Sequence, residues 1–590
     1  MGKWTPFRAP LPRFRSPRRR SGLDGVTSDR RDAIAMIVQV TTAEGLLSEK
    51  ARHRSILLVF AGLVMAMLLA SLDQTIFSTA LPTIVGELNG VEYMLWVITI
   101  YMLASTITLP IYGKMGDLIG RKGIFLGAIS LFIIGSIVGG FAQDMTWLIA
   151  GRGIQGLGGG GLMVLSQAII ADVVPARERG RYMGIMGGVF ALSSVAGPLL
   201  GGWFTEEVTW RWCLWMNIPL GIAAMVAAVF FLHLPPVRTQ RPKVDVAGMM
   251  LLAVASAALV LTTTWGGTMY AWDSPRIIGL IALTLAAGIG FVLVERRAEA
   301  PIMSPSLFRA HNFILTTVSG LIIGVAMFGT LAYLPTFLQM VTGANATQSG
   351  LLMIPMMGGL LVTSIGSGVI VSRTGRYKWF PVIGTFIVAG ALALLSTMEP
   401  GTAVWVICSY LALMGIGLGL CMQILVLIVQ NTFPNSQVGM ATASNNYFRQ
   451  IGASLGTAVV GSLFVTNLGN LLQERLSGSA AAVAGNHNSL TPDAVRALPE
   501  AIRQIVIGAY SEALTPVFLY MVPLVLVAAI LLVFLHEKPL ATSIDRDGPA
   551  ALADGPQAVD EPADVPEQAG AAPAPGGRAP RHRIETTPGD

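Results

Sequence analysis

Long apolar stretches dominate this sequence and constrain its fold more than any other feature. A membrane-spanning α-helix needs ~20 mostly apolar residues. Stretches of about that length lie at residues 55–77, 93–112, 124–142, 147–171, 182–203, 212–232, 246–265, 276–294, 313–338, 349–370, 380–397, 402–429, 448–466 and 513–535. Only 12% of the residues are charged, about half the density of a soluble globular domain. The chain is therefore predicted to be an all-α polytopic membrane protein with fourteen transmembrane helices.

Lysine and arginine are shared unequally between the two sides of this predicted bundle. With the N-terminus inside, the short outer loops carry two, Arg211 and Arg276, and the short cytoplasmic loops carry sixteen. The sixteen are Lys114, Arg121, Lys122, Arg177, Arg179, Arg181, Arg238, Arg241, Lys243, Arg296, Arg297, Arg309, Arg373, Arg376, Lys378 and Arg449. Because positive residues favour cytoplasmic loops, we expect a multi-pass protein of the inner (plasma) membrane with both termini in the cytoplasm.

The two ends of the chain differ from its apolar middle. Residues 1–54 are rich in arginine and include RFRSPRRR, and Met36 is an alternative start. We expect a disordered cytoplasmic tail whose charge lies near anionic lipid. Residues 537–590 are rich in Ala, Pro, Gly and acidic residues, so we expect a second disordered tail.

Two of the predicted cytoplasmic loops resemble each other. GKMGDLIGRK begins at Gly113 and GVIVSRTGRYK begins at Gly368, and the offset of 255 residues also pairs Asp117 with Ser372. A chance likeness of short Gly/Arg loops is one interpretation. The other is a parallel duplication with the transport site between the halves.

The duplication predicts a domain organisation. Two six-helix bundles would span residues 55–233 and 312–536, with an inserted two-helix linker at 234–311 and a long outer loop at 467–510.

Two charged residues lie within the predicted spans of the first half. Asp73 belongs to LDQTIFSTALP and Arg152 to LIAGRGIQGLGGGG, and at 1.5 Å per residue both lie within ~10 Å of the outer surface. A charged side chain inside a bilayer is energetically costly, so we expect it to face protein or water. Asp73 is either a structural acid or a proton carrier. Arg152 either bonds backbone carbonyls or tunes Asp73.

Four segments together resemble a known family over roughly residues 55–536. Besides the two just described, they are GKMGDLIGRKG at 113–123 and SSVAGPLLGG at 193–202. The chain resembles the fourteen-helix drug:proton antiporters of the major facilitator superfamily, of the EmrB/QacA type. The resemblance implies the major facilitator fold, and it implies proton coupling by Asp73 and Arg152.

The resemblance also implies roles for the other two segments. The first would be a conformational latch, formed by Gly113, Asp117, Gly120, Arg121 and Lys122. The second would be an antiporter motif, formed by Gly197, Pro198, Gly201 and Gly202. In that motif a proline bends the helix and glycines admit a close neighbour, although Ser193 stands where the family often has glycine.

A substrate site is harder to place. Candidates to line a cavity are Trp96, Tyr101, Gln155, Phe337, Gln423 and Asn446. Aromatic belts at the membrane interface explain such aromatic residues equally well. The second-half helices carry no acid away from their ends, so recognition there would rely on aromatic and polar groups.

The function expected from these features is secondary active efflux of small amphipathic drugs or toxic compounds, cationic ones included, in exchange for protons. The alternatives are an exporter of one endogenous product, such as a lipid, siderophore or self-made antibiotic, and a non-transporting membrane sensor. No Lys-Ser or Lys-Thr follows the glycines of 148–161, so they are not a phosphate loop. We expect no enzymatic activity, no metal, no other cofactor and no nucleic-acid partner, and a monomer surrounded by membrane lipid.

Overall fold

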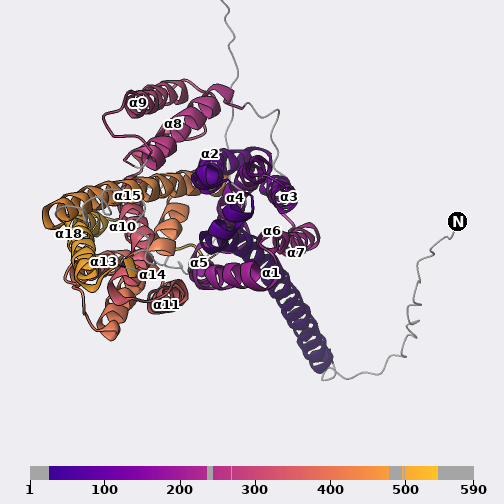
Figure 1. Ribbon diagram of the computed structural model, residues 1–590. Helices are drawn as coiled ribbons and strands as arrows, with labels where there is room; N and C mark the ends of the chain where they lie inside the picture. The colour runs from indigo at the N-terminus through magenta and orange to yellow at the C-terminus, as the bar shows by residue number, and fades with distance from the viewer. Residues whose placement is uncertain are drawn as a thin grey trace, which may run out of the picture. The chain divides into compact units, whose positions relative to one another are not determined.

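The structure is a computed structural model that describes residues 26–88, 90–234, 244–267, 269–476, 495–496 and 498–542. Within these ranges the chain forms α-helices joined by short turns, and no β-strand is present there (Figure 1). Thirteen of the helical segments are long and apolar enough to cross a membrane, and a shorter apolar helix adds a further one. The predicted all-α fold with fourteen apolar segments is confirmed.

The helices of the first half come first in the chain. They are α1 (Val26–Glu87), α2 (Met94–Ile119), α3 (Arg121–Gly140), α4 (Met145–Val173), α5 (Ala176–Trp203), and the pair α6 (Trp212–Trp215) and α7 (Asn217–Phe231). Their buried side chains form two apolar clusters, one around Phe125 and Phe132 and one around Phe77 and Trp210.

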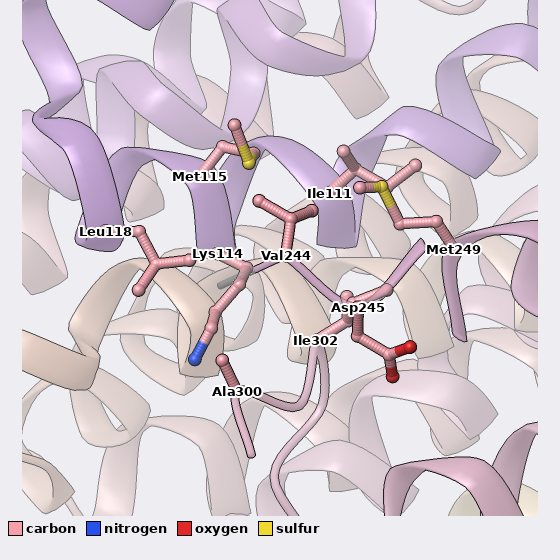
Figure 2. Close-up of a pocket in the computed structure, with 9 residues that line it drawn as sticks. All are labelled: Ile111, Lys114, Met115, Leu118, Val244, Asp245, Met249, Ala300 and Ile302. Atoms are coloured by element: carbon pink, nitrogen blue, oxygen red, sulfur yellow. The ribbon is translucent and has the colours of Figure 1, made fainter. Parts of the chain in front are cut away.

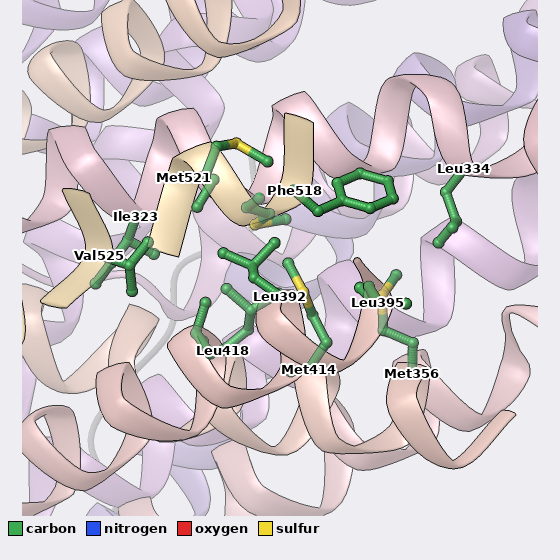
Figure 3. Close-up of a cluster of buried hydrophobic side chains, with 14 of the residues drawn as sticks. Ile323, Leu334, Met356, Leu392, Leu395, Met414, Leu418, Phe518, Met521 and Val525 are labelled. Atoms are coloured by element: carbon green, nitrogen blue, oxygen red, sulfur yellow. The ribbon is translucent and has the colours of Figure 1, made fainter. Parts of the chain in front are cut away.

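The second half repeats this sequence of helices. It contains α10 (His311–Thr342), α11 (Ala346–Leu352), α12 (Ile354–Thr374), α13 (Trp379–Leu395), α14 (Val404–Thr432), α15 (Val438–Arg475) and α18 (Glu500–Val533). A single large apolar cluster holds these helices together, with Met356, Leu392, Leu418 and Phe518 among its fully buried members (Figure 3).

Between the halves lies a helical hairpin, α8 (Val246–Trp265) and α9 (Pro275–Glu295). Helix α8 contacts both α2 and α15, so the hairpin touches both halves. The Ser256 Oγ and Tyr447 Oη atoms are 2.7 Å apart, and Trp272 Nε1 donates to Ser462 Oγ at 2.9 Å. On the other side, the Trp96 and Trp265 rings meet edge to face at 5.5 Å.

A small pocket lies between α2 and the segments that flank the hairpin. Lys114 and Met115 line it on α2, and Val244, Asp245 and Ile302 line it from the segments beside the hairpin (Figure 2). Its volume of about 10 Å³ is far below the several hundred Å³ of a drug-sized site. The pocket therefore reflects loose packing and not a ligand site.

Three predicted boundaries differ from the structure. Residues 26–54 of the tail predicted to be disordered belong to α1, and the outer loop predicted at 467–510 is shortened by α15 and α18. An apolar-length rule detects only the lipid-facing part of a helix, whereas these helices continue beyond it. Leu472 packs in the same cluster as Tyr510, which stabilises the extended ends of α15 and α18.

The remaining parts of the predicted tails and loop, residues 1–25, 477–494 and 543–590, lie outside the described residues.

Candidate functional site

Asp73 and Arg152 form a buried ion pair. Arg152 Nη1 lies 2.5 Å from Asp73 Oδ2, and the two residues are 1% and 2% exposed. They come from α1 and α4, at positions 79 residues apart in the chain. Each charge is removed from water, so each depends on the other for its stability.

Neutral polar groups complete the shell of the carboxylate. Asp73 Oδ1 accepts hydrogen bonds from Gln155 Nε2 at 3.0 Å and from Asn217 Nδ2 at 2.8 Å. Gln155 Nε2 also donates to Ser136 Oγ at 2.7 Å, and Gln155 Oε1 accepts from Arg152 Nη1 at 2.9 Å. Both carboxylate oxygens are thus satisfied in this state.

The arginine is enclosed by two aromatic rings. Its guanidinium carbon lies 4.0 Å from the centre of the Phe77 ring and 4.3 Å from that of Tyr101. A cation over a ring face is stabilised by the ring quadrupole. Arg152 Nε has no hydrogen-bond partner among the described residues, so the aromatic faces and Asp73 carry most of its stabilisation.

Sequence reasoning missed two members of this cluster and assigned two others to a different role. Ser136 and Asn217 are missed because a hydroxyl or amide within an apolar run carries little signal. Tyr101 and Gln155, predicted to line a substrate cavity, are buried around the ion pair.

The predicted antiporter motif packs α5 against α1 beside this cluster. A Cβ added at Gly197 would lie 2.1 Å from Thr75 Oγ1, and one at Gly201 would lie 2.6 Å from the Ile76 carbonyl. Only glycine fits such contacts. Pro198 lies inside α5, and its carbonyl accepts from Thr79 at 3.4 Å.

Two details of this motif differ from the expectation. Gly202 has no described atom within 4 Å of an added Cβ, so it is not a packing glycine here, because it lies on another face of α5. Ser193, which stands in place of a glycine, places its Oγ 2.7 Å from Ser71 Oγ. The serine thereby joins α5 to α1 two residues before Asp73.

The predicted latch residues Asp117 and Arg121 form an ion pair at the end of α2. Arg121 Nη2 lies 2.7 Å from Asp117 Oδ1, and Arg121 Nη1 lies 2.6 Å from Asp172 Oδ1 of α4. Asp172 was not predicted from the sequence. The three charges tie α2, α3 and α4 together within the first half.

This ion-pair cluster also binds the second half. The Asp117 carboxylate accepts from the backbone N–H groups of Gly439 at 3.2 Å and Met440 at 2.7 Å, at the start of α15. Arg121 Nη2 donates to the Asn435 carbonyl at 3.1 Å. A carboxylate near the first N–H groups of a helix is favoured by the helix dipole. We name this contact of α2 with α15 the charged seam.

Glycines shape the charged seam. A Cβ at Gly113 would lie 2.3 Å from Ala443 Cβ, so the helices approach closely there. Gly120 has φ of 98° between α2 and α3, a conformation that disfavours other residues. Lys122 Nζ donates to the Val229 carbonyl at 2.9 Å, so it binds α7 and not the second half.

The repeated loop forms an equivalent contact between α12 and α5, which we name the glycine seam. A Cβ at Gly368 would lie 2.2 Å from the Gly180 carbonyl, and the Gly184 Cα is 3.3 Å away. Ser372 Oγ accepts from the Arg181 N–H at 3.0 Å. The offset of 255 residues that relates Gly113 to Gly368 also relates Gly184 to Gly439, so the two seams are counterparts.

The other predicted cavity residues are dispersed. Trp96 packs against Trp265, and Phe337 lies within the second-half core. Gln423 is buried where α14 approaches Gly187. Asn446 Nδ2 donates to Gln167 Oε1 of α4 at 2.9 Å.

One basic residue lies where the sequence did not place it. Arg449, predicted in a cytoplasmic loop, lies inside α15, because that helix begins at Val438 and not near residue 448. Arg449 Nη2 donates to Asn446 Oδ1 at 2.6 Å. Residues 438–447 are mostly small or polar, so a search for apolar stretches does not detect them as part of a helix. Ala443 and Ser444 are nevertheless fully buried.

Comparison with known proteins gives consistent results. Residues 63–457 match the sequence model of the Major Facilitator Superfamily. An uncharacterised MFS-type transporter of Mycobacterium tuberculosis is 42% identical over 86% of this chain and 74% of its own length. The multidrug transporter protein MdtP of Bacillus subtilis is 35% identical over 80% of this chain and 89% of its own.

Two further comparisons agree. Multidrug resistance protein 3 of Bacillus subtilis is 33% identical over 84% of this chain and 98% of its own length. The solved proton:xylose symporter XylE superposes with a TM-score of 0.55 at 14% identity, over 83% of this chain and 98% of that one. At that identity the superposition concerns the fold alone.

Proposed function

The chain belongs to the Major Facilitator Superfamily, and from this premise we propose that it is a secondary active efflux transporter that exports small amphipathic compounds in exchange for protons. Its two six-helix bundles and inserted hairpin are those of a transporter fold, and relatives at 33–35% identity are named for multidrug transport or resistance. The observation that carries the proton-coupled part is the buried Asp73–Arg152 pair, because an ionisable pair in a membrane interior has a functional role by default.

The ion pair supplies a way to couple proton binding to conformation. In the state described here Asp73 accepts from Gln155, Asn217 and Arg152, and Arg152 is its charged partner. If α1 and α4 move apart, Asp73 loses this partner and becomes able to bind a proton. A proton taken up in one state and released in the other drives the cycle.

The two seams supply the conformational part. Both lie at the end of the helices where loops 113–123 and 372–379 are found, and both join the first half to the second. We propose that this end faces the cytoplasm of the plasma membrane, with both termini inside. Export then requires the seams to open for substrate uptake and to close for release outside.

Proteoliposomes with an imposed pH gradient test this proposal. Wild-type protein should accumulate at least one dye from an amphipathic panel when the gradient is applied, and Asp73→Asn should abolish this response. Asp144→Asn is the matched control, since Asp144 is an exposed acid that caps α4 and its replacement should leave transport intact. Gradient-driven accumulation by Asp73→Asn would mean that another group carries the proton.

A further inference from the structure

Arg449 lies in the membrane interior with no opposing charge among the described residues, and we propose that it is the recognition group for the acidic headgroup of the substrate. The substrates would be amphipathic compounds that carry an oxyanion, such as a carboxylate. This inference rests on the proposed export function and specifies its substrate class.

Contacts along α15 place Arg449 near the middle of the membrane. The charged seam binds α15 at Met440, and Trp272 of the hairpin turn binds it at Ser462. At 1.5 Å per residue, Arg449 lies about 14 Å from the first contact and about 20 Å from the second. Tyr447, two residues away from Arg449, forms a hydrogen bond with Ser256, which lies halfway along α8. This contact also places Arg449 near the middle of the membrane.

The side chain of Arg449 faces the boundary between the halves. Its Nη2 donates to Asn446 Oδ1, and the Asn446 amide donates in turn to Gln167 of α4. The guanidinium is therefore separated from the first half by a single side-chain amide. Arg449 is partly buried in the described structure.

Arg152 and Arg121 have acidic partners, whereas Arg449 has none among the described residues. Asp73 and Arg152 neutralise each other, and Arg121 lies between Asp117 and Asp172. Arg449 forms no ion pair within the described part of the chain, and its guanidinium donates a hydrogen bond to a neutral amide there. A guanidinium within a bilayer is costly unless it gains a partner, and the described residues supply no acidic partner here.

An acidic substrate would supply that partner. A guanidinium presents a planar fork of donors that matches a carboxylate with two parallel hydrogen bonds. The same unbalanced charge disfavours a cationic compound at this depth. The geometry thus favours amphipathic acids over the cationic drugs that the sequence resemblance alone would include.

An alternative is that Arg449 has only a structural role and positions Asn446 at the boundary between the halves. The two interpretations predict different effects of an Arg449 variant on different substrates. A structural residue would be needed for every substrate, whereas a recognition group would be needed only for the acid.

The experiment uses the full-length protein in proteoliposomes with three compounds that share one naphthyl-alkyl body: the acid, its methyl ester and the primary amine. Wild-type protein should transport the acid at least tenfold faster than the amine. Arg449→Gln should reduce acid transport at least tenfold and ester transport less than twofold, and Arg449→Lys should retain part of the acid transport. Arg475→Gln is the control, because Arg475 pairs with Glu512 at the far end of α15.

Binding to purified protein provides a second measurement. The acid should bind wild-type protein more tightly than the ester does, and Arg449→Gln should abolish the difference. Preference of wild-type protein for the amine, an equal loss of all three compounds in Arg449→Gln, or equal binding of acid and ester would each overturn the inference. Gradient-independent transport of every compound would instead contradict the proposed antiport and leave the binding result to decide on Arg449.

Discussion

Asp73 keeps two neutral donors even if its arginine is removed, so charge and hydrogen bonding can be separated at this residue. Gln155 and Asn217 would still bond Asp73 Oδ1 in an Arg152→Gln variant, but the buried carboxylate would lose its counter-charge. The charge, and not the number of hydrogen bonds, then determines the cost.

We predict that Arg152→Gln destabilises the protein by about 3–5 kcal/mol, the usual cost of removing one member of a buried pair. The double variant Asp73→Asn/Arg152→Gln should recover most of that loss because no unpaired charge remains. Thermal unfolding of the purified proteins in detergent measures both. A double variant no more stable than Arg152→Gln would show that packing around Phe77 and Tyr101, and not charge, dominates.

The same residues show what a sequence can and cannot indicate. Asp73 and Arg152 were recognised because a charge in an apolar run is conspicuous, and the structure places them in contact. Asn217 and Ser136 were not recognised, because their polarity is common in membrane helices. Arg449 was misplaced because α15 begins ten residues before its predicted start. Those ten residues are mostly small or polar, so a search for apolar stretches does not detect them.

At the scale of helices, two adjacent glycines in α5 offer a matched comparison. Gly201 faces α1, where an added Cβ would lie 2.4 Å from Thr79 Oγ1, whereas Gly202 faces open space. Helix propensity is the same at both positions, so any difference between the two alanine variants reports the contact of α5 with α1.

We predict that Gly201→Ala lowers stability by about 1–3 kcal/mol, the usual cost of overpacking, and impairs transport by pushing α5 away from Asp73. Gly202→Ala should leave both properties close to wild type. Thermal unfolding and dye transport are measured for both variants. Equal behaviour of the two would indicate that α5 and α1 tolerate separation, contrary to the contacts described here.

The membrane-spanning segments themselves were predictable, because each has an apolar stretch of about the required length. Their contacts were not. The sequence offset paired Asp117 with Ser372, but it gave no indication that Asp117 binds the start of α15 or that Ser372 binds the start of α5. Such contacts depend on helix tilt and spacing, which an apolar pattern does not encode.

At the scale of the whole molecule, orientation in the membrane follows from charge alone. Arg373 is exposed in the last turn of α12, and Asp273 lies on an exposed turn between α8 and α9. From the positive-inside rule we propose that the first faces the cytoplasm and the second the outside.

We predict that Asp273→Cys reacts with a membrane-impermeant maleimide in intact cells and that Arg373→Cys reacts only after the cells are opened. Both variants are made after Cys213, Cys408 and Cys421 are replaced by serine, and the serine-only protein is the control. Reaction of residue 373 from outside would reverse the proposed orientation.

The two seams are counterparts in the repeat but are held by different forces. The charged seam combines a carboxylate and a guanidinium with backbone partners, whereas the glycine seam relies on close backbone packing and a serine hydrogen bond. The two seams should therefore separate by different means, the charged seam by loss of its ion pair and hydrogen bonds and the glycine seam by unpacking of α5 from α12. A molecule whose helices are arranged by a near-symmetric duplication would thus open asymmetrically.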